Sequence, residues 1–337
     1  MSAEPLVSVV IPAYNAEKTI RNTIHSVLEQ TMSDLDVIVV DDASTDSTAG
    51  VVESIGDPRL RLLKSPSNSR CAAARNLGLR NAQGAWVTFL DADDEFAANR
   101  LESLLAVALK DGECFVGDWM AACVPGKGGR LTPPPELWRS AGEVPQKALD
   151  YGAPSGWGAC AFPLLPRKAL ARHRLEFAEW ASGGEWTYLV SRLCAAGLRG
   201  KVLCQVGYLT RLTGRHDSST LRAVEEQLRV NDVLAEAPDV PEPIKERLRR
   251  GRHGIRRRLI IASLRERRWE KFAFYARENP GDLLWLPGSV LRFLWRQAAY
   301  RFARPAWSLP RRWAAPGRTE PQNHPSPTAA KPAANWR

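Results

Sequence analysis

Short apolar segments alternate with amphipathic ones through the first third of the chain. Most of the apolar segments are rich in β-branched residues and stop at polar or turn-forming residues, the pattern of a buried strand. The expected strands lie at 6–12, 36–42, 59–63, 85–90 and 114–117. The helical pattern between them predicts a helix from Ile20 and others at 47–55, 71–82 and 98–110. Strands that alternate with helices predict a parallel α/β sheet with helices on both faces.

Polar side chains follow three of these strands. The stretch "VTFLDADDEF" at 87–96 places four carboxylates directly after apolar residues. In parallel α/β sheets the ligand lies beyond the carboxyl ends of the strands. The residues at these ends are Tyr14 with Asn15, Asp41 with Asp42, and Asp91 to Asp94. We therefore expect the functional site at this edge of the sheet.

The rest of the chain changes character twice. Residues 124–160 are rich in Gly and Pro and predict loops that form a mobile wall of the site. A helix is expected at 182–197, entered through glycines, and a strand or loop at 208–220. After about residue 221 the chain becomes basic, with eight Lys or Arg and one Glu at 245–258. The last stretch, 315–337, is rich in Pro and Ala, which predicts disorder.

The overall charge favours an anionic partner. The chain has 337 residues, a formal net charge of +10 and a pI of about 9.6. A phosphate-bearing ligand or an anionic membrane surface fits this excess, and a simply solvated basic surface fits it as well. The sequence has no nucleic-acid recognition motif of the usual kinds, so we expect no nucleic-acid partner.

Cysteine spacing and apolar run lengths indicate a cytoplasmic protein. The six cysteines show no C-x-x-C spacing, which argues against a metal knuckle and a disulfide framework and favours a reducing compartment. The N-terminal residues lack the charged and long apolar regions of a signal peptide. No run reaches the roughly 18 apolar residues of a spanning helix.

The acids after the strand at 85–90 suit a divalent cation. In extended backbone, residues two apart such as Asp91 and Asp93 share a face. Hard oxygen ligands at that spacing suit Mg²⁺ or Mn²⁺ held between protein and phosphates. Such an ion neutralises the charge that develops on a diphosphate leaving group.

The N-terminal part resembles the family 2 glycosyltransferases, which have the GT-A fold. The resemblance is close over about 6–118 and looser to about 220, and it is carried by "VSVVIPAYNAEKTIRNTIHSVLEQT", "DVIVVDDASTDST" and "AAARNLGLRNAQGAWVTFLDADD". It implies a mainly parallel, Rossmann-like nucleotide-binding sheet flanked by helices. It also implies a nucleotide-sugar donor, usually a UDP-sugar, a Mn²⁺ or Mg²⁺ cofactor, and inversion at the anomeric carbon. "DPRLRLL", "GYLTRLTGRHDSST" and the basic, Trp-rich tail are most similar to bacterial exopolysaccharide transferases of the succinoglycan type.

The resemblance carries roles onto individual residues. Pro12, Ala13 and Tyr14 would form the floor under the nucleotide base, with Asp41 or Asp42 accepting hydrogen bonds from the uracil or ribose. Arg70, or Arg75 as the alternative, would lie against the base. Asp91 and Ala92 would touch the ribose or sugar, and Asp93 would ligate the metal. Asp94 completes the acidic string, and its alternative role is to cap the helix at 98–110. His216, with Arg211 and Arg215 nearby, would lie near the metal or diphosphate.

An inverting transfer also needs a carboxylate base opposite the leaving group. The family supplies it from a Gly-Glu-Asp-Trp-like motif at a helix start. Aligned through Arg192 and Leu193, this chain has Trp186 at the usual Asp position, so Glu185 is the candidate base. Glu185 as a first-turn acid that complements the helix dipole is the plainer alternative. The fallback bases are Glu179 and Asp217, and Trp186 and Trp157 are candidate acceptor-side residues.

These expectations define a domain plan. Residues 1–220 would form the GT-A domain, with the nucleotide-sugar side at 1–118 and the acceptor side at 119–220. A basic helical extension at 221–314 and a disordered tail at 315–337 would follow. The extension would lie on the inner face of the cytoplasmic membrane, where lipid-linked saccharides are found, or would be a packing domain. The rival to an enzyme is a non-catalytic nucleotide-sugar-binding or scaffolding protein.

Overall fold

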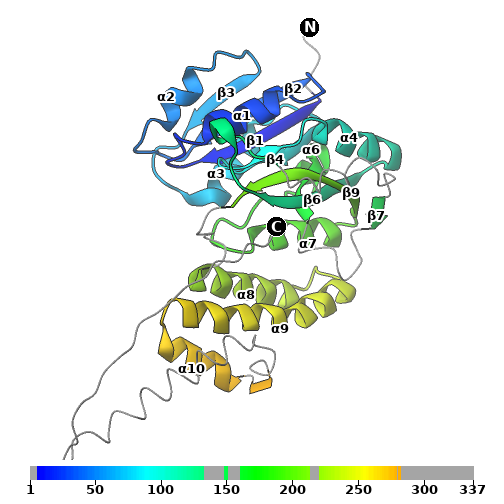
Figure 1. Cartoon of the computed structure of the whole chain (residues 1–337). Coiled ribbons are helices and arrows are strands. Elements are labelled where there is room, and N and C mark those ends of the chain that lie inside the picture. Colours follow the sequence, from blue (N-terminus) through cyan, green and yellow to red (C-terminus); the bar gives the residue numbers. More distant parts are fainter. Residues whose placement is uncertain (1–5, 133–147, 151–159, 213–219, 279, 282–337) are drawn as a thin grey trace, which may run out of the picture. The chain divides into compact units, whose positions relative to one another are not determined.

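The computed structural model describes residues 6–132, 148–150, 160–212, 220–278 and 280–281. Contacts divide the chain into a unit at 1–285 and a second unit at 286–337, and all the described residues belong to the first. That unit contains a nine-stranded sheet, with helices packed on it (Figure 1).

The half of the sheet that holds the predicted nucleotide side is parallel, as expected. Its strands are, in order, β3 (Leu60–Lys64), β2 (Leu35–Asp41), β1 (Val7–Ala13) and β4 (Trp86–Phe89). In the register, Val7 lies beside Leu35 on one side and Trp86 on the other, and Ala13 lies beside Asp41. Every residue of β1 and β2 is buried, which explains their nearly continuous apolar sequences.

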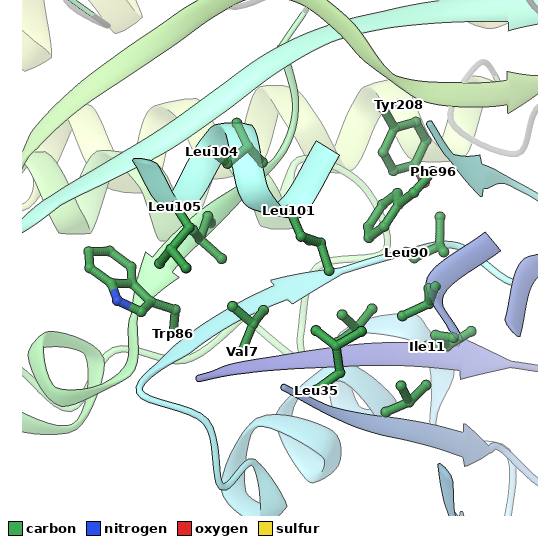
Figure 2. Close-up of a cluster of buried hydrophobic side chains, with 14 of the residues drawn as sticks. Val7, Ile11, Leu35, Trp86, Leu90, Phe96, Leu101, Leu104, Leu105 and Tyr208 are labelled. Atoms are coloured by element: carbon green, nitrogen blue, oxygen red, sulfur yellow. The ribbon is translucent and has the colours of Figure 1, made fainter. Parts of the chain in front are cut away.

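Helices cover both faces of this half. Alternate residues of β1 point to opposite faces, so Val9 and Ile11 belong to one hydrophobic cluster and Val10 to another. The first cluster, drawn in Figure 2, contains residues of α1 (Ile20–Leu28) and α4 (Arg100–Asp111). The second contains residues of α3 (Arg70–Asn81), α6 (Arg167–Arg172) and α7 (Glu185–Ala195). The short helix α2 (Thr48–Glu53) connects β2 to β3.

Beyond β4 the sheet is mixed rather than parallel. β8 (Cys160–Pro166) runs antiparallel to β4 and to β6 (Cys114–Cys123), and β6 is parallel to β9 (Arg199–Arg211). β5 (Glu95–Phe96) and β7 (Ala148–Asp150) are both antiparallel to β9. The expected strand at 114–117 continues to Cys123, and residues 208–211 of the expected strand or loop at 208–220 form the end of the longer β9. β5 follows the acidic residues directly, so the acidic segment connects the two halves of the sheet.

Three helices complete the described chain. They are α8 (Leu221–Glu236), α9 (Glu242–Arg265) and α10 (Trp269–Glu278), which pack against one another (Figure 1). Thr220 caps α8, because its side-chain oxygen accepts a hydrogen bond from the Ala223 N–H at 3.2 Å. In the basic helix α9, Ile255 and Leu259 are buried in a cluster with residues of α8.

Several predictions fall outside the described residues. They concern most of the loop wall at 124–160, the part of the basic extension after residue 281, and the tail at 315–337. The boundary at 314/315 also lies outside the described residues, and both it and the boundary at 220/221 stay predictions. Among the helices that are described, none is both long and apolar enough to cross a membrane.

Candidate functional site

The loops after β1 and β2 are fastened to each other at the carboxyl edge of the sheet. Asn15 has a positive φ of 51°, and its side-chain oxygen accepts a hydrogen bond from the Thr45 N–H at 2.8 Å. The Ala16 N–H donates to Thr48 Oγ1, also at 2.8 Å. Tyr14 stands at this edge with half of its surface exposed. The two loops therefore form one rigid rim beside the buried Ala13.

The neighbouring carboxylates Asp41 and Asp42 have different surroundings. Asp42 accepts hydrogen bonds from the Ser69 hydroxyl at 2.7 Å and from the Arg70 N–H at 2.8 Å. It thereby satisfies donors at the start of α3, where Arg70 has a positive φ of 73°. The Asp41 carboxylate accepts only the Ser44 N–H, at 3.2 Å, within the described part of the chain. Asp41 therefore keeps acceptor capacity for a ligand, whereas Asp42 is committed to the protein.

The acidic segment after β4 is held from two sides. On one side, the Arg75 guanidinium binds the Asp91 carboxylate at 2.8 Å. On the other, β9 supplies Tyr208, whose hydroxyl accepts the Asp91 N–H at 3.2 Å. The Arg211 N–H donates to Asp94 Oδ1 at 2.8 Å. These bonds fix the backbone from which the acids project.

The pKa of Asp94 is strongly raised. Burial, and then the charges of Asp91 and Asp93, raise the pKa of Asp94 to about 7, although bonds from Arg211 and Tyr208 oppose the rise. The alternative that Asp94 caps the following helix is wrong. That helix, α4, begins at Arg100 with Asn99 at the cap position, and the Asp94 carboxylate is bound to β9 instead.

Arg211 binds main-chain oxygens rather than standing free for phosphates. Its Nε donates to the Asp93 carbonyl at 3.0 Å, and its Nη2 donates to the Gly129 carbonyl at 2.9 Å. Glu95, the next acid, accepts the Leu131 N–H at 2.9 Å. Through these bonds the acidic segment is joined to the Gly-rich turn at 126–131.

Arg75 lies at the centre of the site. Its side chain is 4% exposed, and it binds Asp91 at 2.8 Å and Glu185 at 2.9 Å. Three aromatic rings surround the guanidinium at 5.3 to 5.6 Å, those of Phe162, Phe177 and Trp186. Burial alone would lower the pKa of Arg75, but the neighbouring negative groups raise it well above its usual value. The group is a permanent cation between two carboxylates.

Two glycines place Glu185 at the first position of α7. Gly184 has a positive φ of 81° at the N-cap. A Cβ on Gly183 would lie 2.3 Å from the Ala223 carbonyl oxygen, so only glycine allows this approach to α8. Trp186, the next residue, packs its ring 4.7 Å from the rings of both Phe162 and Phe177. Its predicted role on the acceptor side is not tested by these contacts and stays a prediction.

The remaining candidates are scattered or lie outside the described residues. The candidates that lie outside the described residues are His216, Asp217 and Trp157. Glu179 accepts a hydrogen bond from Asn76 at 2.9 Å and does not contact Arg75. The Ala92 carbonyl accepts the Thr23 hydroxyl at 2.9 Å. Pro12 of β1 is buried and lies beside Val40 of β2.

The acid set is compatible with a metal shared with a ligand, and not with an all-protein cage. In the described ranges no three His, Cys, Asp or Glu residues gather to hold an ion. Mg²⁺ is commonly bound by one or two carboxylates with substrate phosphates completing its shell. Asp91 and Asp93 offer such oxygens, and a cation there would relieve the like-charge repulsion that Asp94 experiences.

Comparison with known proteins identifies the family. The sequence model described as Glycosyl transferase family 2 matches residues 8–170. The chain is 41% identical over 111 residues to the UDP-Glc:alpha-D-GlcNAc-diphosphoundecaprenol beta-1,3-glucosyltransferase WfgD of Escherichia coli, a match covering 33% of this chain and 44% of the relative. It is 31% identical over 227 residues to the succinoglycan biosynthesis protein ExoO of Rhizobium meliloti (strain 1021), covering 65% and 64%.

Solved structures show the same fold. S. aureus TarS 1-349 in complex with UDP-GlcNAc matches with a TM-score of 0.52 and 20% sequence identity, over 76% of this chain and 71% of that one. The chain spans less than half the length of several curated relatives, 44% or 45% of three of them. Residues 8–170 therefore match a glycosyl transferase family 2 domain, and the fold is the GT-A fold.

Proposed function

We propose that the protein transfers a sugar from a UDP-sugar to a lipid-linked or growing saccharide in the synthesis of a bacterial surface polysaccharide, with inversion at the anomeric carbon. The observation that carries the proposal is the buried Arg75, which joins Asp91, on the expected donor side, to Glu185, the candidate base. The names of WfgD and ExoO, and the UDP-GlcNAc complex of TarS, support the substrate class.

On the donor side of the site, residues at the ends of different strands have different roles. Asp41, which has acceptor capacity left, receives hydrogen bonds from the uracil or ribose. Pro12, Ala13 and the exposed ring of Tyr14 form the floor under the base, and Arg70 flanks it. Asp42 contributes indirectly, because it holds the start of α3 in place.

The acids at 91–94 hold the diphosphate end of the donor. Asp93, together with phosphate oxygens, would bind Mn²⁺ or Mg²⁺, which supplies neutralisation of the leaving diphosphate when it is bound. Asp91 and Ala92 contact the ribose or sugar. Tyr208 and the main chain of Arg211 keep these acids at one position during binding.

Glu185 accepts the proton of the attacking hydroxyl. It sits on the first turn of α7 with its side chain 18% exposed, so solvent and an acceptor can reach it. The Gly-Glu-Asp-Trp-like motif can also be aligned through its tryptophan, and Glu185 then occupies the position of the family's Asp. The ion pair with Arg75 holds the Glu185 carboxylate in place on the side of the site that faces Asp91.

We also place the protein on the inner face of the cytoplasmic membrane, as a peripheral protein. The basic stretch at 245–258 within α9 supports this, since each basic residue near an anionic surface contributes about 1 kcal/mol. Flotation of the full chain with anionic and with neutral vesicles tests it. Equal recovery with both vesicle types would remove the membrane from the proposal.

The function is tested by calorimetric titration of the purified protein with UDP, first with Mn²⁺ and then with EDTA, followed by UDP release from UDP-sugars. We expect metal-dependent binding that Asp93→Ala abolishes, and turnover that Glu185→Gln abolishes while UDP binding is kept. Binding without turnover under any donor and acceptor would favour the non-catalytic, scaffolding alternative. Near-normal turnover by Glu185→Gln would refute the base assignment.

A further inference from the structure

A cleft lies outside the centre formed by Arg75, Asp91 and Glu185. It has a volume of about 280 Å³, close to the lower end of the roughly 300–1,000 Å³ of ligand pockets. The segment 174–180 forms one wall, and Tyr188 and Arg192 of α7 form the other. No role in the proposed reaction has been assigned to this cleft.

Two aromatic rings dominate the cleft. Trp180 is 40% exposed, so its ring is open to a ligand. Its ring lies 6.1 Å from that of Tyr188 at an interplanar angle of 84°. The ring of Tyr188 is anchored from below, since it packs against the buried cluster that contains Ala178, Ala181 and Val230. The Tyr188 ring is therefore held in place in the absence of a ligand.

Arginines border the two rings. The Arg229 guanidinium of α8 lies 5.0 Å from the centre of Trp180, and that of Arg192 lies 6.0 Å from the centre of Tyr188. Arg192 is also held by Asp239 at 2.6 Å. Arg229 is held more weakly, because its side chain is 64% exposed and the acid that pairs with it, Glu226, is 4.0 Å away. A ligand can displace Arg229 from the indole at little cost.

Hydrogen-bonding groups remain available in the cleft. Within the part of the chain that the structure describes, the Arg174 guanidinium and the Tyr188 hydroxyl have no hydrogen-bond or ion-pair partner. Glu179 uses Oε1 for Asn76 and Arg80, and its side chain is 48% exposed. The cleft therefore offers a donor, an acceptor and a hydroxyl around an aromatic face.

We propose that this cleft is a saccharide-binding subsite, in which a sugar ring stacks on Trp180 and its hydroxyls bond to Tyr188, Glu179 and Arg174. Sugar rings present an apolar C–H face and a rim of hydroxyls, and this pairing of an aromatic face with polar groups is complementary to both. A purely apolar ligand would leave the Arg174 guanidinium and the Tyr188 hydroxyl without a partner, which costs binding free energy.

The position of the cleft connects it to the proposed reaction. Phe177 lines the cleft, and its ring also lies 5.6 Å from the Arg75 guanidinium. Tyr188 follows Glu185 by one helical turn in α7. The subsite would hold a part of the saccharide acceptor or product that is remote from the transferred sugar. The choice of a saccharide as the ligand rests on the proposed function.

The test is binding of the full chain to a printed array of bacterial surface saccharides, without nucleotide or metal, so that it does not depend on turnover. The best-bound saccharide is then titrated by calorimetry into wild type, Trp180→Ala, Tyr188→Phe and Asp93→Ala. Phe274→Ala is the matched control, because Phe274 is 56% exposed but lies on α10, outside the cleft. Thermal unfolding of each variant verifies that it is folded.

We expect Trp180→Ala to weaken binding by about tenfold and Tyr188→Phe to weaken it by a few-fold. Asp93→Ala and Phe274→Ala should bind as wild type does, even if UDP binding and turnover fail. The proposal is overturned if no saccharide binds without nucleotide, or if Trp180→Ala binds like wild type. A saccharide lost only in Asp93→Ala would place binding at the donor site instead.

Discussion

The Arg75 guanidinium lies 2.9 Å from the Glu185 carboxylate although 110 positions separate the two residues in the chain. One comes from α3 and the other from α7, and Asp91 binds the same guanidinium from the end of β4. The candidate base and the donor side of the site are therefore coupled through one buried cation. A change at either carboxylate alters the electrostatic surroundings of the other.

Replacing Arg75 should damage both stability and catalysis. Arg75→Met keeps much of the volume but leaves Asp91 and Glu185 without their cation, which should cost about 3 kcal/mol of unfolding free energy. This is the lower end of the usual range, because Asp91 is one-third exposed. Urea unfolding measures the loss, and Arg80→Met, at a surface ion pair, is the control. Equal stability of the two variants would contradict the central role of Arg75.

Substitutions at Asp41 and Asp42 should have different effects. The first should weaken UDP binding, and the second should lower the free energy of unfolding. Asp41→Asn removes the charged acceptor with spare capacity and should weaken UDP binding by about 1.5–3 kcal/mol, with little change in unfolding. Asp42→Ala removes the bonds to Ser69 and Arg70 and should lower the unfolding free energy by about 1–2 kcal/mol. Calorimetry and thermal unfolding on both variants give the comparison. The reverse pattern would assign base recognition to Asp42.

Tyr208→Phe tests the support of the acidic segment from β9. The variant keeps the buried ring, which packs 5.8 Å from Phe96, but removes the hydroxyl that accepts the Asp91 N–H. An unsatisfied buried N–H costs about 1–3 kcal/mol, so both the unfolding temperature and metal-dependent UDP binding should fall. Tyr275→Phe, which removes a hydroxyl from α10, should leave UDP binding unchanged. A Tyr208→Phe protein that binds UDP normally would show that β9 is not needed to hold the acids.

The contact between α8 and α10 should weaken in acid. Burial opposes ionisation of Glu225, but hydrogen bonds from Tyr275 at 2.6 Å and Lys271 at 3.0 Å outweigh it and lower the pKa of Glu225 below its ordinary 4.5. A lowered folded-state pKa means stability that is present above pH 4.5 and lost as the pH falls through the folded-state value. Because Glu225 is one-third exposed, we expect at most about 1 kcal/mol. Glu225→Gln should flatten that part of the pH–stability curve, and an unchanged curve would argue against the contact.

Gly207 should tolerate no side chain. A Cβ there would lie 1.8 Å from Asp118 Oδ2 and 2.8 Å from Arg100 Cγ, within a fully buried ion pair. Gly207→Ala should therefore cost more than about 3 kcal/mol, through strain and a weakened pair. Gly254→Ala, in the open on α9, should be neutral or stabilise by up to about 1 kcal/mol. Similar melting temperatures for the two variants would be inconsistent with the packing around Gly207.

The parallel half of the sheet could be predicted because the residues that mark each strand and its polar end are neighbours in the sequence. Segments such as 36–42 are apolar along their length and acidic at the end, so strand and site edge are visible together. The choice between Asp41 and Asp42 was not visible, because it depends on where the N–H groups of Ser69 and Arg70 fall. That position is set by tertiary packing of α3.

Most of the mixed half of the sheet could not be predicted from the sequence. β9 begins at Arg199 with "RGKVLCQVG", in which glycines and polar residues interrupt the alternation expected of a strand. Its register with β6 also shifts near Asp118 and Trp119. Tyr208, Phe162 and Phe177 therefore gave no signal as neighbours of the site. Their contribution arises from contacts between distant segments, which no local pattern encodes.

The acidic segment has a consequence for how the protein is made. Its bonds from Tyr208 and Arg211 span 117 positions of the chain, so the ribosome must release β9 before they can form. Domains commonly begin to fold during synthesis from their N-terminal parts. The nascent parallel half can assemble its strands early, but its acids acquire their final positions late. Capture of a diphosphate would then await the strand that completes the opposite half, and a truncated chain would hold no donor.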